Sequence, residues 1–202
     1  MMSKEKKLAD IAKDITQNLS CPLKDNAQNL VFGKGNPRAD ILFIGEAPGA
    51  KEDECGLPFM GAAGKRLDKM LQTVGLTLDD CYIANILKYR PPKNRDPTYD
   101  EIMNHTPFLL KQIDVIKPKI IIPLGTYATA FVLAGFNAEK KAMKQIEPIS
   151  KTHGVVHERK LGKQTITVIP LYHPAALIYR PKLQIEMEAD LSVAKKLMEK
   201  KK

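Results

Sequence analysis

Four short apolar runs, separated by segments with helical periodicity, constrain the fold of this chain more than any other feature of its sequence. The runs are largely continuous rather than alternating, which is typical of strands covered on both faces in a parallel sheet. The predicted strands are Asp40–Gly45, Cys81–Leu87, Lys119–Gly125 and Thr165–Leu171. The predicted helices are Lys4–Asn18, Gly64–Val74, Tyr99–Ile116, Thr126–Leu133 and Leu183–Glu199. This order predicts an α/β fold, a three-layer α/β/α sandwich around a central, mainly parallel four-stranded sheet.

The chain of 202 residues has the length of one domain, and we expect a single domain over residues 1–202. The polar segment Asn137–Gly162 predicts a surface excursion with a short strand near Val155. A domain boundary in this segment would separate the fourth strand from its sheet. The Lys-rich end, residues 195–202, predicts a solvated tail.

Charge and cysteine content limit the classes of partner and the compartment. The 32 Lys and Arg residues exceed the 23 Asp and Glu residues by nine, which favours a polyanionic partner such as nucleic acid or an anionic membrane face, with simple solubility as the alternative. Three scattered cysteines form no C-x-x-C pair, so neither a disulfide framework nor a zinc knuckle is expected. The charged N-terminus has no signal-peptide pattern, and Pro123 and Gly125 interrupt the longest uncharged run, Ile120–Ala138. We therefore expect a cytoplasmic protein without a membrane segment.

Three polar side chains lie in or directly after three different predicted strands. Glu46, Asn85 and His173 lie at or just beyond the carboxyl ends of the first, second and fourth strands. In open α/β sheets the carboxyl ends of the strands share one edge, where ligands bind. Each residue alone has a structural explanation, as a helix-capping carboxylate, a loop-bonding amide or a buried imidazole. Their convergence on one edge favours a functional site.

The segments around these residues carry recognisable motifs. They read FGKGNPRADILFIG, GEAPGAKEDECGLPFMGAAGKRLDKML, YIANILKYRPPKNRDPT and YHPAALIYRP, in this order along the chain. Together they resemble the thermophile-type, family 4 uracil-DNA glycosylases over about Cys21 to Leu191. The resemblance implies a base-excision repair enzyme that flips uracil out of DNA and hydrolyses its N-glycosidic bond. A catalytically weak DNA-binding member that acts as a damage sensor or scaffold is the alternative.

The resemblance also implies how the base is held. Phe59 would stack on the flipped uracil, and the Asn85 amide, both donor and acceptor, would read O4 and N3–H. Backbone N–H groups of the Glu46–Gly49 turn, which includes Ala47, would complete the pocket. Cytosine presents the reverse pattern of donors and acceptors, so it would leave two buried groups unpaired.

Three further residues are implied in catalysis and one more in water binding. His173 would donate a hydrogen bond to uracil O2, where negative charge develops as the bond breaks. Glu46, Glu52 and Asn94 would position the attacking water and stabilise the cationic sugar. The sequence leaves open which of the two carboxylates carries more of this task.

DNA contacts are expected beside the pocket. Leu177 is placed like an apolar wedge that fills the gap left by the flipped nucleotide, and a buried helix leucine is the alternative. Basic residues next to the pocket are expected to contact phosphates: Lys88, Arg90, Lys93, Arg95 and Arg180.

The chain departs from the family at the iron–sulphur cluster. The four positions that hold cysteine ligands in the family read Asn18, Cys21, Tyr89 and His105 here. Such clusters are held by cysteine thiolates, so we expect no cluster and no metal, with Tyr89 and His105 filling the space. The expected protein is a monomeric, monofunctional uracil-DNA glycosylase that acts on uracil-containing DNA without a cofactor.

Overall fold

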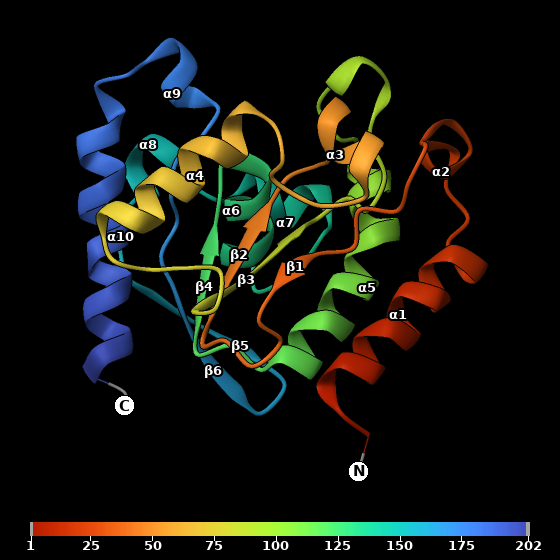
Figure 1. Ribbon diagram of the computed structural model, residues 1–202, viewed down its shortest axis with the longest axis horizontal. Coiled ribbons are helices and arrows are strands. Elements are labelled where there is room, and N and C mark those ends of the chain that lie inside the picture. The colour runs from red at the N-terminus through yellow and green to blue at the C-terminus, as the bar shows by residue number, and fades with distance from the viewer. Residues whose placement is uncertain (1, 201–202) are drawn as a thin grey trace.

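A six-stranded sheet forms the centre of the computed structural model, which describes residues 2–200 (Figure 1). The strand order is β1-β3-β2-β4-β6-β5. The strands are β1 (Lys34–Gly35), β2 (Ile41–Gly45), β3 (Cys81–Asn85), β4 (Ile120–Pro123), β5 (His157–Leu161) and β6 (Gln164–Val168). The four inner strands, β3, β2, β4 and β6, run parallel to one another. They are the four strands that the apolar runs predict.

The prediction of four strands is wrong because the sheet has two further edge strands, each antiparallel to its neighbour. Strand β1 has only two residues, too few for a hydrophobic pattern. Strand β5 is polar and only partly buried, and it pairs with β6 as a hairpin. It begins two residues after Val155, where the sequence indicates a short strand. Continuous apolar runs identify only strands that are covered on both faces, and edge strands are not.

The five predicted helices all form, within two residues of the expected bounds. They are α1 (Lys4–Asn18), α4 (Ala62–Thr73), α5 (Tyr99–Ile116), α6 (Thr126–Leu133) and α10 (Leu183–Lys200). The shorter helices are α2 (Pro22–Asn26), α3 (Ala50–Cys55), α7 (Lys140–Lys144), α8 (Ile149–Thr152) and α9 (Ala176–Tyr179), with a 3-10 turn at Pro92–Asn94. Helix α10 continues through the predicted Lys-rich tail because Met198 is buried. Residues 201–202 of that tail lie outside the described residues.

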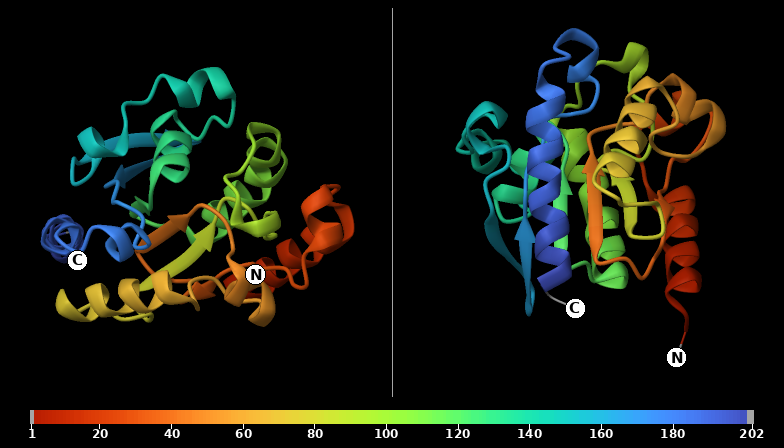
Figure 2. Two further views of the ribbon diagram at one scale, coloured as in Figure 1. Left: turned by 90° about the horizontal axis from the view of Figure 1, so that it is seen from above. Right: turned by 60° about the vertical axis from the view of Figure 1, so that its left-hand side comes forward.

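The helices cover both faces of the sheet, as predicted. Along β2, Leu42 and Ile44 belong to the core formed with α1, α5 and α6, whereas Ile41 and Phe43 belong to the core formed with α4 and α10. Figure 2 shows these two helical layers with the sheet between them. Successive strand residues point to opposite faces, so a continuously apolar strand supplies both cores at once. No helix within residues 2–200 is long and apolar enough to cross a membrane.

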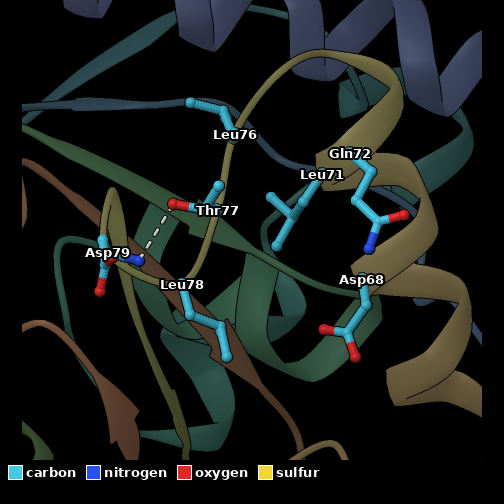
Figure 3. A pocket seen from close by; sticks show the side chains of 7 residues that line it. All are labelled: Asp68, Leu71, Gln72, Leu76, Thr77, Leu78 and Asp79. Atoms are coloured by element: carbon cyan, nitrogen blue, oxygen red, sulfur yellow. Dashed lines mark hydrogen bonds between the residues drawn. The ribbon is translucent and has the colours of Figure 1, made fainter.

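One pocket lies between α4 and the loop that leads into β3 (Figure 3). It is lined by Asp68, Leu71, Gln72, Leu76, Thr77, Leu78 and Asp79. Hydrogen bonds within this loop hold its shape: the Asp79 N–H donates to Thr77 Oγ1, and the Thr77 hydroxyl donates to Asp80 Oδ2. This loop precedes β3, so the pocket lies at the amino ends of the strands, away from Glu46, Asn85 and His173.

Candidate active site

The carboxyl ends of the parallel strands bring Glu46, Asn85 and His173 to one edge of the sheet. Gly45, which precedes Glu46, is paired with Asn85 across β2 and β3. Leu124, which follows β4, is paired with Leu171, two residues before His173. A cavity of about 330 Å³ opens at this edge. It is lined by Glu46, Ala47, Pro48, Pro91, Asn94, Arg95, His173 and Ala175.

Phe59 and Asn85 are packed closely against Gly45 at this edge, and His173 stacks on Phe59. The Phe59 and His173 rings are stacked, with centroids 5.8 Å apart and planes at 29°. A Cβ atom on Gly45 would come within 2.8 Å of the Phe59 ring and still closer to Asn85 Oδ1. Glycine at position 45 is therefore what allows the Asn85 amide and the Phe59 ring to lie side by side.

The Asn85 side chain has an unsatisfied hydrogen-bonding group. The residue is 2% exposed, and its Oδ1 is buried without a hydrogen bond from any residue within 2–200. A buried polar oxygen without a partner costs about 1–3 kcal/mol, so such atoms are rare in folded proteins. A ligand with an N–H or O–H group would satisfy it.

Phe59 is held in a strained backbone conformation. Its φ is +53°, in the left-handed region that a bulky side chain rarely adopts. The Lys34 ammonium donates to the Phe59 carbonyl at 3.1 Å, and a Cβ on Gly64 would collide with the Phe59 backbone. Strain of this kind persists where the surroundings enforce it, which is common at ligand sites.

His173 is a neutral hydrogen-bond donor at physiological pH. Burial lowers the pKa of its imidazole to about 4, although the nearby Glu52 carboxylate acts in the opposite direction. The Ala175 N–H donates to Nδ1 at 3.2 Å, so the proton of the neutral ring is on Nε2. The ring can therefore donate from Nε2 to an acceptor in the pocket.

Glu46 has the properties of a general base. Burial and the negative charge of Asp96 raise the pKa of the Glu46 carboxyl to about 7. A base of this strength is well matched to proton transfer near neutral pH. Asp96 is not among the predicted site residues, because nothing in the sequence connects it to a carboxylate 50 residues earlier.

Glu52 and Gly49 are hydrogen-bonded to each other within the site. Glu52 Oε1 accepts from the Met60 and Gly61 N–H groups, both at 2.7 Å, and Oε2 accepts from the Gly49 N–H at 3.1 Å. The Glu52 carboxylate thus ties the two loops of the site together, and its role in positioning water stays a prediction. The Gly49 N–H, expected to face the substrate, is used in this bond. The N3 position of a capping box could have indicated this.

The predictions for Lys88 and Leu177 are wrong. Lys88 is fully buried, and its ammonium donates to two neutral oxygens in the interior, so it cannot contact a phosphate. Leu177 is 1% exposed and belongs to the core with α4 and α10, which is the alternative stated for it. The neighbouring Ile178 and Tyr179 are 45% and 85% exposed. These two side chains face outward on the same turn.

The remaining basic residues lie on the surface near the pocket. Arg90 donates from Nε to Asn94 Oδ1 at 2.7 Å, so Asn94 both lines the cavity and holds this arginine. Arg95 forms a two-bond ion pair with Glu101, which leaves less of its charge for a phosphate. Lys93 and Arg180 are exposed.

The four positions compared with cluster ligands do not form one ligand set. Asn18 is exposed and donates to Asp14 Oδ1 at 2.7 Å. Cys21, Tyr89 and His105 lie together in the core, where the Tyr89 and His105 rings meet edge to face. His105 Nδ1 accepts from the Lys88 N–H, so its Nε2–H is directed at Cys21 Sγ, 3.3 Å away.

Comparison with known proteins agrees with this geometry. The model of the uracil DNA glycosylase superfamily matches residues 32–195. The chain belongs to this superfamily. A Type-4 uracil-DNA glycosylase of Archaeoglobus fulgidus is 42% identical over 194 residues, which cover 96% of this chain and 94% of the relative. Enzymes of the same description from Sulfurisphaera tokodaii and Thermotoga maritima are 40% and 37% identical, over 94% and 88% of this chain and 84% and 86% of the relatives.

The superfamily match covers the four parallel strands and the loops that follow them. Glu46, Phe59, Asn85 and His173 all lie inside it. Cys21 lies before its first residue. The uracil DNA glycosylase core of this chain is thus the part that carries the candidate active site.

Proposed function

We propose that this protein is a monofunctional uracil-DNA glycosylase, which removes uracil from DNA and leaves an abasic site. One observation carries the proposal: the unpaired, buried Oδ1 of Asn85 lies beside the stacked rings of Phe59 and His173. A flat base with an N–H group would fill this site. The Type-4 relatives are named for uracil, which is such a base.

Recognition would use the two ends of the Asn85 amide. Uracil N3–H donates to Oδ1, and uracil O4 accepts from Nδ2. Cytosine carries an acceptor at N3 and a donor at position 4, so both contacts would be lost. Leaving two buried groups unpaired costs about 1–3 kcal/mol each. Phe59 adds stacking, which any base accepts, so Asn85 supplies the discrimination.

Hydrolysis would use His173 and Glu46. The bond between C1′ and uracil N1 breaks with its electron pair leaving on uracil, and the negative charge that develops on O2 is stabilised by the Nε2–H of His173. The Glu46 carboxylate takes a proton from water, whose oxygen forms the new bond to C1′. The uracil anion leaves and is protonated by solvent.

DNA would lie against the exposed side chains around the pocket. Ile178 and Tyr179 replace Leu177 as candidates for the wedge, because they are the apolar side chains of α9 that reach solvent. Arg90, Lys93 and Arg180 would contact phosphates.

We further propose that the protein works without an iron–sulphur cluster. Among Asn18, Cys21, Tyr89 and His105, only Cys21 can supply a thiolate, and clusters of this kind need four good ligands. Within residues 2–200, no group of three or more His, Cys, Asp and Glu side chains is arranged to hold a metal ion. The test is iron and sulphide analysis of anaerobically purified protein, and about one cluster's worth of iron per chain would contradict the proposal.

A monomer in the cytoplasm is the proposed working form. All three cysteines, Cys21, Cys55 and Cys81, are free thiols. Exposed free thiols such as Cys55 persist in a reducing compartment.

The proposal is tested with a labelled oligonucleotide that contains one uracil, in the presence of EDTA. We expect strand breaks only after alkali treatment, since a monofunctional enzyme leaves the abasic strand intact. His173→Ala should lower the single-turnover rate by about 10²–10³-fold, the usual effect of removing one donor to a developing anion. A folded protein that binds this DNA but leaves uracil in place, single- or double-stranded, would support a sensor or scaffold instead.

A further inference from the structure

Lys88 occupies an unusual place for a lysine. Its side chain is fully buried, and its ammonium donates to the Asn85 backbone carbonyl at 2.7 Å and to Gln112 Oε1 at 2.6 Å. The Gln112 amide in turn donates to the Phe32 carbonyl at 3.1 Å. Burying a lysine among neutral oxygens is costly, so the bonds that its ammonium makes must offset the loss of hydration.

The lysine takes the place of a missing strand neighbour. Strand β1 pairs with β3 through Lys34 and Ile83, and the same antiparallel register, continued by two residues, would set Phe32 opposite Asn85. Strand β1 begins only at Lys34, two residues after Phe32, so this pair is not formed. The Lys88 ammonium and the Gln112 amide bridge the Asn85 and Phe32 carbonyls, which satisfies two backbone acceptors that the short edge strand leaves unpaired.

The residue bridged in this way is the one whose side chain reads the base. We propose that Lys88 is a positioning residue for uracil recognition, which holds the Asn85 main chain so that the Asn85 amide meets the base edge in the orientation required. The proposal rests on the proposed function and names a further specificity-determining residue for it. Lys88 does not touch the substrate.

The chemistry of the ammonium suits this task. Burial lowers the pKa of Lys88 to about 7. A neutral amine still has two N–H donors, and there are two acceptors, so the bridge forms in either protonation state. Methionine has a similar length and fills the same space, but it would leave the Asn85 and Gln112 oxygens buried without a donor.

The test separates base recognition from both stability and DNA affinity. The inhibition constant of free uracil is measured in the excision assay, alongside the salt dependence of DNA binding, for the wild-type protein, Lys88→Met and Lys93→Met. We expect Lys88→Met to raise the inhibition constant about tenfold or more and to leave the salt slope unchanged. Lys93→Met, on the exposed loop, should reduce the salt slope and leave the inhibition constant unchanged.

A second control addresses loss of stability alone. Ile113→Ala removes a fully buried side chain next to Gln112 on α5 and leaves the polar bridge intact. It should keep the wild-type inhibition constant despite a lower melting temperature. If Lys88→Met does not fold, Gln112→Leu leaves the ammonium with one acceptor and should raise the inhibition constant in the same direction by a smaller factor.

The outcomes distinguish the two proposals. A wild-type protein that excises uracil, together with Lys88→Met or Gln112→Leu at the wild-type inhibition constant, would overturn the role of Lys88 alone. A smaller salt slope in Lys88→Met with unchanged uracil inhibition would also overturn it, since that is the behaviour of a phosphate contact. A folded wild-type protein that does not excise uracil would overturn the proposed function itself.

Discussion

A single methyl group at position 45 should disable the site without unfolding the protein. Gly45 ends β2, and a Cβ atom there would lie 2.8 and 2.9 Å from two carbons of the Phe59 ring and closer still to Asn85 Oδ1. Ordinary contacts begin near 3.4 Å. In Gly45→Ala the ring must therefore move by about 0.6 Å and the amide by more.

The size of the effect follows from that displacement. Both groups that would hold the base are displaced, and one of them, the Phe59 ring, is stacked on His173. A misplacement near 1 Å can cost about 10²-fold in rate, because the reacting groups no longer meet in the required geometry. We expect Gly45→Ala to lower the single-turnover rate of uracil excision by about 10²-fold. Overpacking of a core site typically costs about 1–3 kcal/mol of stability, so the variant should remain folded.

Gly61→Ala is the matched control. Gly61 lies two residues after Phe59 and has an ordinary backbone conformation, with φ −81°. A Cβ atom added to Gly61 would have Glu52 Oε1 as its nearest neighbour, at 3.3 Å. This variant should stay within a few-fold of the wild-type rate. Equal rates for Gly45→Ala and the wild-type protein would refute the placement of Asn85 and Phe59 at the reacting base.

Three further perturbations test other parts of the site. The rate of excision should fall as the pH drops below about 7, because protonated Glu46 cannot accept a proton. Asp96→Asn should move this fall to lower pH, because it removes one of the two causes that raise the Glu46 pKa. A pH–rate profile that is the same in both proteins would contradict this. Glu52→Gln should lower the free energy of unfolding in urea titrations by about 1–3 kcal/mol, because an amide side chain cannot accept hydrogen bonds from all three backbone N–H groups. An unchanged urea midpoint would show that the carboxylate does not hold the loops. Replacing Arg90 and Lys93 by Ala should flatten the plot of log K against log salt by about one unit per lost phosphate contact, and an unchanged slope would place the DNA elsewhere.

The parallel core of the fold was predictable from the sequence because burial on both faces leaves a simple signature. A strand such as Ile41–Gly45 is apolar at every position. The alternation of such strands with helices along the chain predicts the three-layer sandwich. The same logic predicted that Glu46, Asn85 and His173 would meet, since parallel strands end at one edge. The edge strands β1 and β5 left no such signature, since one is too short and the other is polar.

The errors within the site have two physical origins, a long-range contact at Lys88 and a very short helix at Leu177. Lys88 stands at the start of a basic segment, which favoured a surface role, but it also follows seven buried residues of the strand and its exit. Its acceptor Gln112 is 24 residues away, on a different helix. Leu177 lies on α9, a helix of four residues, which is too short for a period that would separate its buried and exposed faces.

The exit of β3 joins Asn85, the proposed base-reading residue, to the buried side chains of Cys21, Tyr89 and His105. The Lys88 side chain bridges back to Asn85, and its backbone N–H donates to His105, whose ring is directed at Cys21. Tyr89, the next residue, packs against the same His105 ring. On the proposal that no cluster binds here, this set of hydrogen bonds and ring contacts has to fix the segment that follows Asn85. Burial lowers the pKa of His105 to about 4, so the ring remains neutral and keeps Nδ1 free to accept from Lys88 at any pH at which DNA repair operates. On the same proposal, this hydrogen-bonded core holds the exit of β3 without a metal, because its buried donors and acceptors pair with one another.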